Sequence, residues 1–349
     1  MTDTRTTARV EALRQWIAPQ HGLPPSQARL ELAAGDASFR RYFRLWLADG
    51  RTRIIMDAPP DKENSQPFVA IADDWRRAGL PVPALYAMDL DLGFIELEDL
   101  GDAALHLCFE AGDCEAAATQ GCYERALTLL DALQNRAPCE SLPPYDDALL
   151  GRELDLFPQW CLEKLLAIAP PPCWQASRAR LIEIALDQPR VAVHRDFDAM
   201  NLMRRDDELW LIDFQDAVCG PLSYDLISLL RGRYCRFSRA RYTAWVDAFR
   251  QRAIADGRLP TVTDAEAFLF MSDAMAAQRA IKVLGIFCRL TLRDGKQGYL
   301  ERMPHFLAHL RDSLEAWPEF AELLGWLDAV FSPALDAELI RRGIRGVSP

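Results

Sequence analysis

The chain has 349 residues and a formal net charge of −11 at pH 7, because 40 Lys and Arg stand against 51 Asp and Glu. Half of the residues are hydrophobic, which excludes an intrinsically disordered chain and a collagen-like fibre. The acidic balance argues against a general nucleic-acid-binding protein, since such a protein needs a basic surface to displace counterions from phosphates. Only four of the 40 basic residues are lysines, so arginine carries almost all of the positive charge.

Length and cysteine usage narrow the class of protein further. The length predicts about two domains. We expect a cytoplasmic protein without a membrane partner, because the N-terminus has no apolar signal segment and charges interrupt every apolar run before the roughly 18 residues of a membrane span. Nine cysteines are scattered from Cys108 to Cys288 without a CxxC pair. This pattern is typical of reduced core thiols, so neither a zinc site nor a disulfide framework is expected.

The sequence pattern changes from strands to helices near residue 100. The first hundred residues read mainly as strands and turns, with strands expected at 38–46, 53–56 and 93–97 and a helix at 65–78. A short strand-like stretch at 191–213 interrupts the helical part, with a hairpin-like turn at Asp206–Asp207. This order predicts an α+β protein with a small β-rich lobe at 1–99 and a larger, mainly helical lobe at 100–349. Helices are expected at 116–135, 148–168, 174–187, 239–256, 264–292 and 299–314.

The stretch from Val191 to Asp216 carries the most informative motif. A His-Arg-Asp triplet ends at Asp196, Asn201 follows five residues later, and Asp213 comes twelve residues after that, in an apolar strand. Phosphoryl transfer needs one carboxylate to accept or orient the acceptor hydroxyl, and an oxygen ligand with a second carboxylate to hold Mg²⁺ against nucleotide phosphates. A tight loop followed by a hairpin would bring these three side chains together. The spacing is similar to the H-R-D-x-x-x-x-N and D-F-G motifs of protein kinases, although the second motif here reads D-F-Q.

Each of these residues also has an ordinary structural interpretation. Asp196 could cap the loop, Asn201 could be a turn residue, and Asp213 could be an edge-strand carboxylate. The joint spacing and the flanking apolar strands favour phosphotransferase chemistry over these separate alternatives. His194 is expected to brace the loop through hydrogen bonds rather than transfer a proton, because Asp196 already fills the role of the base.

With these motifs the chain resembles the aminoglycoside phosphotransferase and choline kinase-like family, from Gly35-Asp-Ala-Ser-Phe-Arg-Arg-Tyr-Phe-Arg44 to about Phe306. The resemblance implies a protein kinase-like bilobal fold and an ATP donor with Mg²⁺. It implies that Asp196 is the catalytic base and that Asn201 and Asp213 are metal ligands. Asp225, in the segment GPLSYD, matches an aspartate that braces the catalytic loop, so it is a structural support together with His194.

Six segments in combination resemble one bacterial group within this family: GDASFRRYFR, IIMDAPP, LEDLGD, HRDFDAMNLM, LIDFQDA and AAQRAIKVLGIF. Kinases of that group phosphorylate the anomeric C1 hydroxyl of N-acetylmuramate and N-acetylglucosamine in peptidoglycan recycling. The resemblance implies the same amino-sugar substrates here, and no nucleic-acid partner. Two alternatives stay open, namely a kinase for a cationic acceptor such as an aminoglycoside or choline, and a non-catalytic nucleotide-binding pseudokinase.

The nucleotide site departs from the kinase plan at one position. Kinases keep a lysine in the third strand to pair with phosphates, and the matching position here is Met56. We expect an arginine to replace this lysine. The candidates are Arg40, Arg41, Arg44 and Arg53, and Arg44 or Arg53 is preferred. The alternative is that no side chain supplies this charge and that magnesium alone neutralises the phosphates. The other expected nucleotide contacts are the small-residue turn Asp36, Ala37, Ser38 and Phe39 and the segment Glu98 and Leu100, where the resemblance places the adenine hinge.

The acceptor site is expected on the helical side of the motif. Asp198 and Asp216 lie near the predicted base and metal ligands in the sequence and could bind sugar hydroxyls or ammonium groups. At helical spacing Arg279, Lys282 and Arg289 share one face of the helix at 264–292. We predict Arg279 and Lys282 as contacts of the lactyl carboxylate of N-acetylmuramate; the alternative is a solvated face paired with surface carboxylates.

Overall fold

The computed structural model describes residues 4–35, 39–109 and 113–344. The chain folds as two compact units, which we call unit 1 and unit 2. Unit 1 consists of residues 1–105 and 201–216, and unit 2 consists of residues 106–200 and 217–349. The lobe boundary predicted at residues 99 and 100 stays a prediction.

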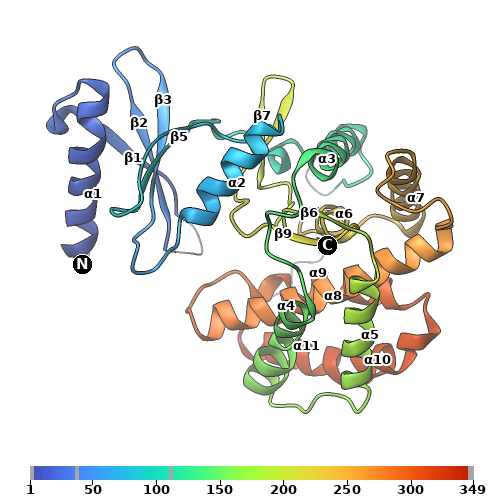
Figure 1. Cartoon of the computed structure of the whole chain (residues 1–349). Coiled ribbons are helices and arrows are strands. Elements are labelled where there is room, and N and C mark those ends of the chain that lie inside the picture. The colour runs from blue at the N-terminus through green and yellow to red at the C-terminus, as the bar shows by residue number, and fades with distance from the viewer. Residues whose placement is uncertain (1–3, 36–38, 110–112, 345–349) are drawn as a thin grey trace. The chain divides into compact units, whose positions relative to one another are not determined.

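Unit 1 is built on a five-stranded antiparallel sheet (Figure 1). Its strands lie in the order β1-β2-β3-β5-β4, so that β2 and β5 flank β3. The inner strands β3 and β5 are buried over several consecutive residues, which indicates that both faces of the sheet are covered there. The strands are β1 (Arg29–Gly35), β2 (Arg41–Trp46), β3 (Thr52–Asp57), β4 (Leu85–Asp89) and β5 (Phe94–Glu98).

Helix α1 (Thr4–Ile17) covers one face of this sheet. Leu13 and Ile17 of the helix form a buried apolar cluster with Phe43 of β2, Ile55 of β3 and Phe94 of β5. Because side chains alternate along a strand, Met56 points to the opposite face from Ile55, where it lies across from Tyr42 and Ile95.

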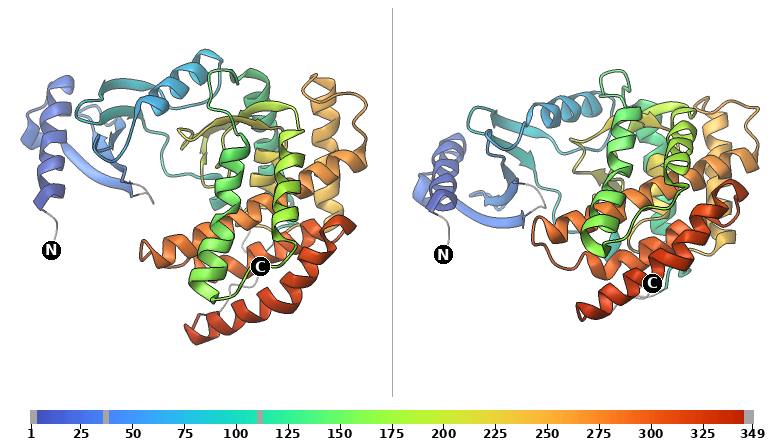
Figure 2. Two further views of the ribbon diagram at one scale, coloured as in Figure 1. Left: turned by 60° about the horizontal axis from the view of Figure 1, so that its bottom comes forward. Right: turned by 90° about the horizontal axis from the view of Figure 1, so that it is seen from below.

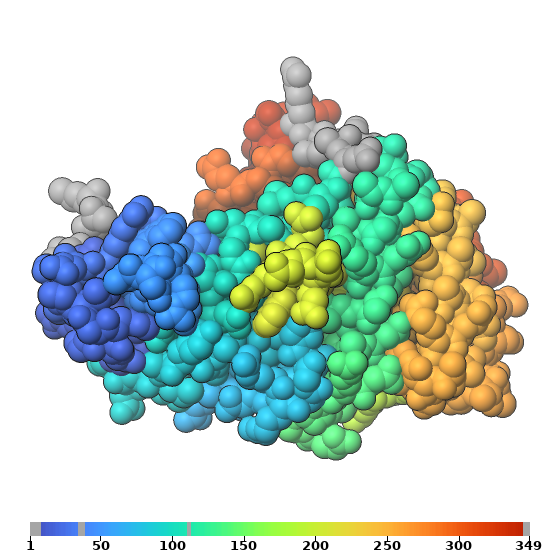
Figure 3. Space-filling model, turned by 90° about the horizontal axis from the view of Figure 1, so that it is seen from above, coloured from blue at the N-terminus to red at the C-terminus, as the bar shows by residue number. Residues whose placement is uncertain are grey.

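A helix and a hairpin complete unit 1. Helix α2 (Gln66–Arg77) packs through Phe68 and Trp75 against Phe214, and the Phe68 and Phe214 rings are stacked with centroids 5.0 Å apart. Phe214 follows the hairpin of β7 (Leu202–Arg205) and β8 (Glu208–Leu211). The hairpin turn is exposed and is visible on the surface in Figure 3 as the yellow segment.

Unit 2 is mainly helical, and its longest helix, α8 (Ala265–Leu292), runs through its core (Figure 2). A two-stranded ladder of β6 (Arg190–Val193) and β9 (Val218–Pro221) lies beside it. The other helices that lie wholly in the described part of unit 2 are α3 (Ala117–Arg136), α4 (Asp147–Leu154), η4 (Phe157–Leu166), α5 (Trp174–Leu186), α6 (Tyr224–Leu230), α7 (Arg239–Ala255), η5 (Leu300–Arg302), α9 (Met303–Leu314), η6 (Pro318–Phe320), α10 (Ala321–Trp326), η7 (Leu327–Phe331) and α11 (Ser332–Arg341).

The α+β architecture predicted from the sequence is confirmed, with local differences. Helix α1 and strands β1 and β4 were not expected in the first hundred residues, and the single helix expected at 148–168 is two helices, α4 and η4, with Pro158 at the start of the second. Pro lacks the backbone N–H that would continue α4, which explains the break. No helix in the described part of the chain is long and apolar enough to cross a membrane.

The expectation that all cysteines are reduced is wrong for one pair, because Cys139 and Cys219 form a disulfide with their Cα atoms 5.0 Å apart. The segment before α4 runs beside β9 and brings the two residues together. Tyr145 donates its backbone N–H to the carbonyl of Cys219 at 2.8 Å, and Cys219 donates its own to Pro143 at 2.8 Å. This pairing joins residues 80 positions apart, a separation that gives no signal in the sequence.

Candidate active site

The predicted base, Asp196, lies in the loop that follows β6 in unit 2, and its side chain is exposed. Asp225, at the start of α6, supports this loop through hydrogen bonds to its backbone. Its buried carboxylate accepts the backbone N–H of His194 at 2.6 Å and that of Arg195 at 3.0 Å. Arg195 has a φ of 73°, a left-handed conformation that non-glycine residues rarely adopt and that clusters at functional sites. These bonds hold the loop in a strained conformation that presents Asp196 to solvent.

Burial raises the pKa of Asp225 to about 7, although the two backbone N–H groups and the charge of Arg279 act in the opposite direction. The negative charge of Asp196 adds to the rise. The two aspartates therefore interact electrostatically, which agrees with the support role predicted for Asp225.

Arg195 points away from Asp196 into a buried group that we call the Glu153 cluster: Tyr145, Glu153, Arg195, Tyr224 and Lys282. The carboxylate of Glu153 accepts hydrogen bonds from the Arg195 guanidinium and the Tyr145 hydroxyl, and its Oε1 lies 2.8 Å from Lys282 Nζ. Lys282 also donates to the Tyr224 hydroxyl at 2.9 Å. The cluster thus joins α4, the catalytic loop, α6 and α8 through one carboxylate.

The Glu153 cluster holds two cations on one carboxylate. Burial alone would raise the pKa of Glu153, but the positive charges of Lys282 and Arg195 outweigh it and hold that pKa at about 2. Burial acts to lower the pKa of Lys282, and the charge of Glu153 overcomes it, so the pKa of the lysine is raised. Both groups are therefore ionised at neutral pH, and they anchor the base of the catalytic loop.

Asp198 lies on the other side of the same loop. It is buried, its backbone N–H binds the carbonyl of Asp196 at 2.8 Å, and its Oδ2 accepts a hydrogen bond from Arg233 Nε at 3.2 Å. Neighbouring residues of the loop therefore make contacts with different parts of unit 2. Arg195 ties the loop to the Glu153 cluster, Asp198 ties it to the segment after α6, and Asp196 stands between them.

The predicted metal ligands, Asn201 and Asp213, both belong to unit 1, at the two ends of the β7–β8 hairpin. The hairpin brings them together, because Ile212 donates its backbone N–H to the carbonyl of Asn201 at 3.1 Å. Asp213 has a left-handed φ of 64°, which an aspartate tolerates better than a β-branched residue. The side chain of Gln215 donates to Asp213 at 2.9 Å and to Asp216 at 3.3 Å.

The donor set of this hairpin fits a hard divalent cation. An amide oxygen and a carboxylate are oxygen ligands of the kind Mg²⁺ takes in nucleotide sites, with phosphate and water oxygens completing the shell. Within residues 4–35, 39–109 and 113–344 no group of three His, Cys, Asp or Glu is arranged to hold a metal ion. A metal at Asn201 and Asp213 would therefore depend on ligands from the nucleotide, and the assignment stays a prediction.

The four arginines considered for the phosphate contact lie in different places. Strand alternation puts Arg41 and Arg53 on the face covered by α1, where Arg41 pairs with the buried Asp57 and Arg53 lies 3.5 Å from Glu96. Arg44 lies on the Met56 face. There its guanidinium binds Asp99, at 2.6 Å, and also Asp102.

Arg40 differs from the other three arginines. It is buried and lies just before β2, with Nη2 3.9 Å from Asp213 Oδ1 and Nε 4.0 Å from Glu63. Its charge therefore sits beside a predicted metal ligand. Met56, where kinases keep their lysine, is fully buried in the sheet.

The remaining nucleotide contacts are only partly described. Asp36, Ala37 and Ser38 lie outside the described residues, and Phe39 donates its backbone N–H to Glu63 at 3.1 Å. Glu98, at the end of β5, donates its backbone N–H to Ala84 at 2.8 Å and forms an ion pair with Arg205. Leu100 packs in a small apolar cluster with Ala104 and Met203. Their roles as adenine contacts stay predictions.

The cationic stripe on α8 is neither a free surface nor a solvated face. Lys282 is buried in the Glu153 cluster, and Arg279 is buried where its charge acts on Asp225. Both side chains thus face buried carboxylates, so their role as acceptor contacts stays a prediction. Sequence reasoning missed Glu153, which is separated from its partners by 42 and 129 positions, and it noted Gln215 only as a departure from D-F-G.

Three comparisons place the chain among known proteins. Residues 29–268 match the model of the phosphotransferase enzyme family. An N-acetylmuramate/N-acetylglucosamine kinase of Pseudomonas putida is 41% identical over 298 residues, which cover 84% of this chain and 86% of that protein. The chain therefore belongs to the phosphotransferase enzyme family, and it is a phosphotransferase.

Solved structures agree on the fold. The ethanolamine kinase of Plasmodium vivax superposes with a TM-score of 0.61 at 10% identity, covering 90% of this chain and 89% of that one. An amicoumacin kinase solved in complex with AMP-PNP, Ca²⁺ and Ami has a TM-score of 0.55 at 13% identity, covering 90% of this chain and 96% of that one. The fold is kinase-like, with a five-stranded antiparallel sheet followed by a mainly helical region.

Proposed function

We propose that the protein is an ATP-dependent kinase that phosphorylates the anomeric C1 hydroxyl of N-acetylmuramate and N-acetylglucosamine. The observation that carries this proposal is the loop of Asp196, whose exposed carboxylate is presented by a strained backbone braced on Asp225. The name of the relative from Pseudomonas putida, at 41% identity, supports the choice of acceptors. A role in peptidoglycan recycling follows from those sugars.

Asp196 is the proposed general base. Its carboxylate accepts the proton of the C1 hydroxyl as the oxygen attacks the γ-phosphorus of ATP, and ADP departs from the opposite side. The neighbouring residues keep this carboxylate in place. Asp225 holds the backbone before it, and Arg195 fixes that backbone to Glu153, so Asp196 pays little reorganisation when the acceptor binds.

Asn201 and Asp213 are the proposed ligands of Mg²⁺. When bound, the ion would neutralise charge that develops on the β- and γ-phosphates. Gln215 orients the Asp213 carboxylate through its amide, which gives the glutamine of D-F-Q a positioning role.

Among the four candidate arginines, the structure favours Arg40 as the phosphate contact. Its guanidinium lies 3.9 Å from the carboxylate of Asp213, a proposed Mg²⁺ ligand, so its positive charge would act on the phosphates of a nucleotide bound with that ion. Arg44 is engaged by two carboxylates, and Arg41 and Arg53 lie on the face covered by α1. An arginine can bind phosphate through two N–H groups at once, which a lysine cannot.

An ADP-release assay with four acceptors tests the function. We expect turnover with N-acetylmuramate and N-acetylglucosamine, and none above background with choline or kanamycin. Turnover with choline or kanamycin alone would show a kinase for cationic acceptors. Release of ADP with none of the four, by a protein that binds ATP, would show a nucleotide-binding module instead.

A further inference from the structure

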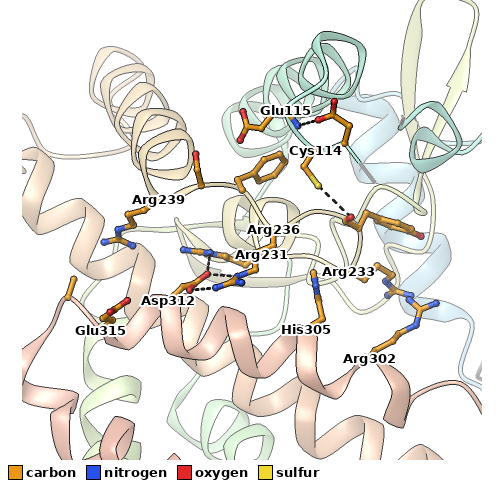
Figure 4. Close-up of a pocket in the computed structure, with 15 residues that line it drawn as sticks. Cys114, Glu115, Arg231, Arg233, Arg236, Arg239, Arg302, His305, Asp312 and Glu315 are labelled. Carbon is orange, nitrogen blue, oxygen red and sulfur yellow. Dashed lines mark hydrogen bonds and ion pairs between the residues drawn. The ribbon is translucent and has the colours of Figure 1, made fainter. Parts of the chain in front are cut away.

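A cavity of about 1000 Å³ opens in unit 2 beside the catalytic loop, and the proposed mechanism leaves it without a role. Its volume is that of a small-molecule site. Three stretches of chain line it: residues 113–115, the segment 231–239 after α6, and residues 302–316 along α9 (Figure 4). Five arginines reach its wall, in a protein whose net charge is −11, and we call it the arginine cavity: Arg231, Arg233, Arg236, Arg239 and Arg302.

The positive charges of the arginine cavity are not fully matched. Arg231 and Arg236 share one carboxylate, that of Asp312, at 3.1 and 2.7 Å. Arg231 is only 3% exposed, and its Nε and Nη2 have no hydrogen-bond partner. Arg302 is exposed, and no ion pair is found for it in the part of the chain that the structure describes. Asp312 neutralises only one of the two charges of Arg231 and Arg236, and Arg302 adds a further positive charge, so this side of the cavity attracts an anion.

Four carboxylates also line the cavity, those of Asp113, Glu115, Asp312 and Glu315, and in the described part of the chain only Asp312 forms an ion pair with an arginine of the wall. Arg239 is paired outside the cavity wall with the buried Asp273, and Glu115 lies 3.3 Å from Arg241. Figure 4 shows Glu315 on the Arg239 side of the cavity, whereas Arg233 and Arg302 are on the other. Burial raises the pKa of the neighbouring Tyr234 to about 12, the charge of Asp198 adds to that rise, and the charges of Arg233 and Arg302 oppose it.

Two histidines of α9 at the arginine cavity, His305 and His309, do not add to its positive charge. His305 and His309 both face the carbonyl of Gly232, at 2.9 and 3.1 Å. Burial lowers the pKa of both rings, and the charge of Arg236 lowers them further. Both rings are therefore neutral at pH 7, so the positive charge of the cavity wall comes from its arginines.

The arginine cavity is connected to the catalytic loop. Arg233 donates to Asp198, whose backbone N–H binds the carbonyl of Asp196. The charge of Asp196 also acts on the Arg233 guanidinium. If a molecule bound at Asp196 extended past Arg233, an acidic group on it would approach Arg302.

We infer that Arg302, supported by the unmatched charge of Arg231 and Arg236, binds the carboxylate of an acidic amino-sugar acceptor. This inference rests on the proposed function. N-acetylmuramate differs from N-acetylglucosamine by a lactyl ether that carries one carboxylate, so this subsite would distinguish the two sugars. A guanidinium binds such a carboxylate with two parallel N–H···O hydrogen bonds.

The test compares the two sugars in a variant that removes the charge and keeps a shorter polar side chain. Arg302→Gln is expected to lower the ratio of kcat/KM for N-acetylmuramate to that for N-acetylglucosamine about tenfold, through a higher KM for N-acetylmuramate. Arg302→Lys should restore part of the ratio. Arg180→Gln removes an arginine of α5 that pairs with Glu183 and Glu319 and does not line the cavity, and it should leave the ratio unchanged.

A neutral acceptor gives a second readout. The wild-type protein should prefer N-acetylmuramate to its carboxamide, and Arg302→Gln should lose that preference. An unchanged ratio, or equal losses with both sugars, would overturn the carboxylate subsite while the sugar kinase stands. If the wild-type protein phosphorylates neither sugar, the proposed function fails first and the subsite falls with it.

Discussion

The Glu153 cluster and the arginine cavity flank the same catalytic loop and each hold two cations on one carboxylate. They differ in the cations that this carboxylate leaves over. In the Glu153 cluster one buried carboxylate binds two cations and a tyrosine hydroxyl, and every contact is within the protein. In the arginine cavity Asp312 likewise binds two cations, but the buried Arg231 keeps unpartnered N–H groups and Arg302 faces open space. A closed group of charges stabilises the fold, whereas an open one is suited to bind a ligand.

The loop between the two regions gives the largest expected effect. Asp196→Asn removes the base without changing the volume of the side chain, so kcat should fall about a thousandfold while the melting temperature stays near that of the wild type. Steady-state ADP release and a thermal melt measure the two quantities. Asp206→Asn, in the exposed hairpin turn, is the matched control and should retain full activity. A loss of less than tenfold at Asp196 would contradict its role as the base.

Breaking the closed region should cost stability. Glu153→Gln leaves Lys282 and Arg195 buried without a countercharge, so the free energy of unfolding should fall by about 3 kcal/mol in a urea titration. Asp312→Asn breaks the corresponding carboxylate in the open region. Its loss should be smaller, about 2 kcal/mol, because Arg236 and Asp312 are partly exposed to water although Arg231 is buried. Equal losses in the two variants would remove the distinction between the regions.

The same cluster predicts a pH dependence. The folded pKa of Glu153 is about 2, below the ordinary value of 4.5, so its ionised form stabilises the fold. This stabilisation is complete above about pH 4.5 and is lost as the pH falls from there toward 2. Urea titrations at pH 7 and pH 4 should show a smaller difference in Glu153→Gln than in the wild type. An identical difference in the two proteins would place the acid sensitivity elsewhere.

The smallest expected effect lies in unit 1. Arg40→Ala should raise KM for ATP about tenfold with a small change in kcat, because the arginine is proposed to bind phosphate in the ground state as well as in the transition state. Arg51→Ala removes an exposed arginine that pairs with Asp49, and it serves as the control. If Arg44→Ala or Arg53→Ala raises KM for ATP and Arg40→Ala does not, the sequence-based preference for those two residues is right.

The residues that sequence analysis located lie close together in the chain or repeat with a helical period. Asp196, Asn201 and Asp213 are identified by spacing within one short stretch, and the long helix α8 by its apolar pattern. The partner of Lys282 could not be found in this way, because Glu153 comes from a helix 129 residues earlier. A positive residue on one face of a helix is usually expected to be exposed to solvent. Only the tertiary structure shows that a buried carboxylate faces Lys282.

The arginine cavity shows the same limit. Arg302 and Arg231 lie 71 positions apart and follow no motif, and the charges that stay unmatched become visible only when the partners of each arginine are known. The scarcity of lysine was visible in the composition, but it did not indicate which arginine would contact the phosphates in place of the kinase lysine. That choice depends on strand alternation in the sheet, which places Arg53 and Met56 on opposite faces.

The position of the transferred phosphate tests the central claim most directly. The wild-type protein is incubated with ATP, Mg²⁺ and N-acetylglucosamine, and the product is analysed by phosphorus NMR with and without proton decoupling. We predict one phosphate ester whose phosphorus couples to the anomeric proton, which shows that it lies on C1. A phosphate that couples instead to the protons of C6, or to any position other than C1, would contradict the proposal that this kinase acts on the anomeric hydroxyl.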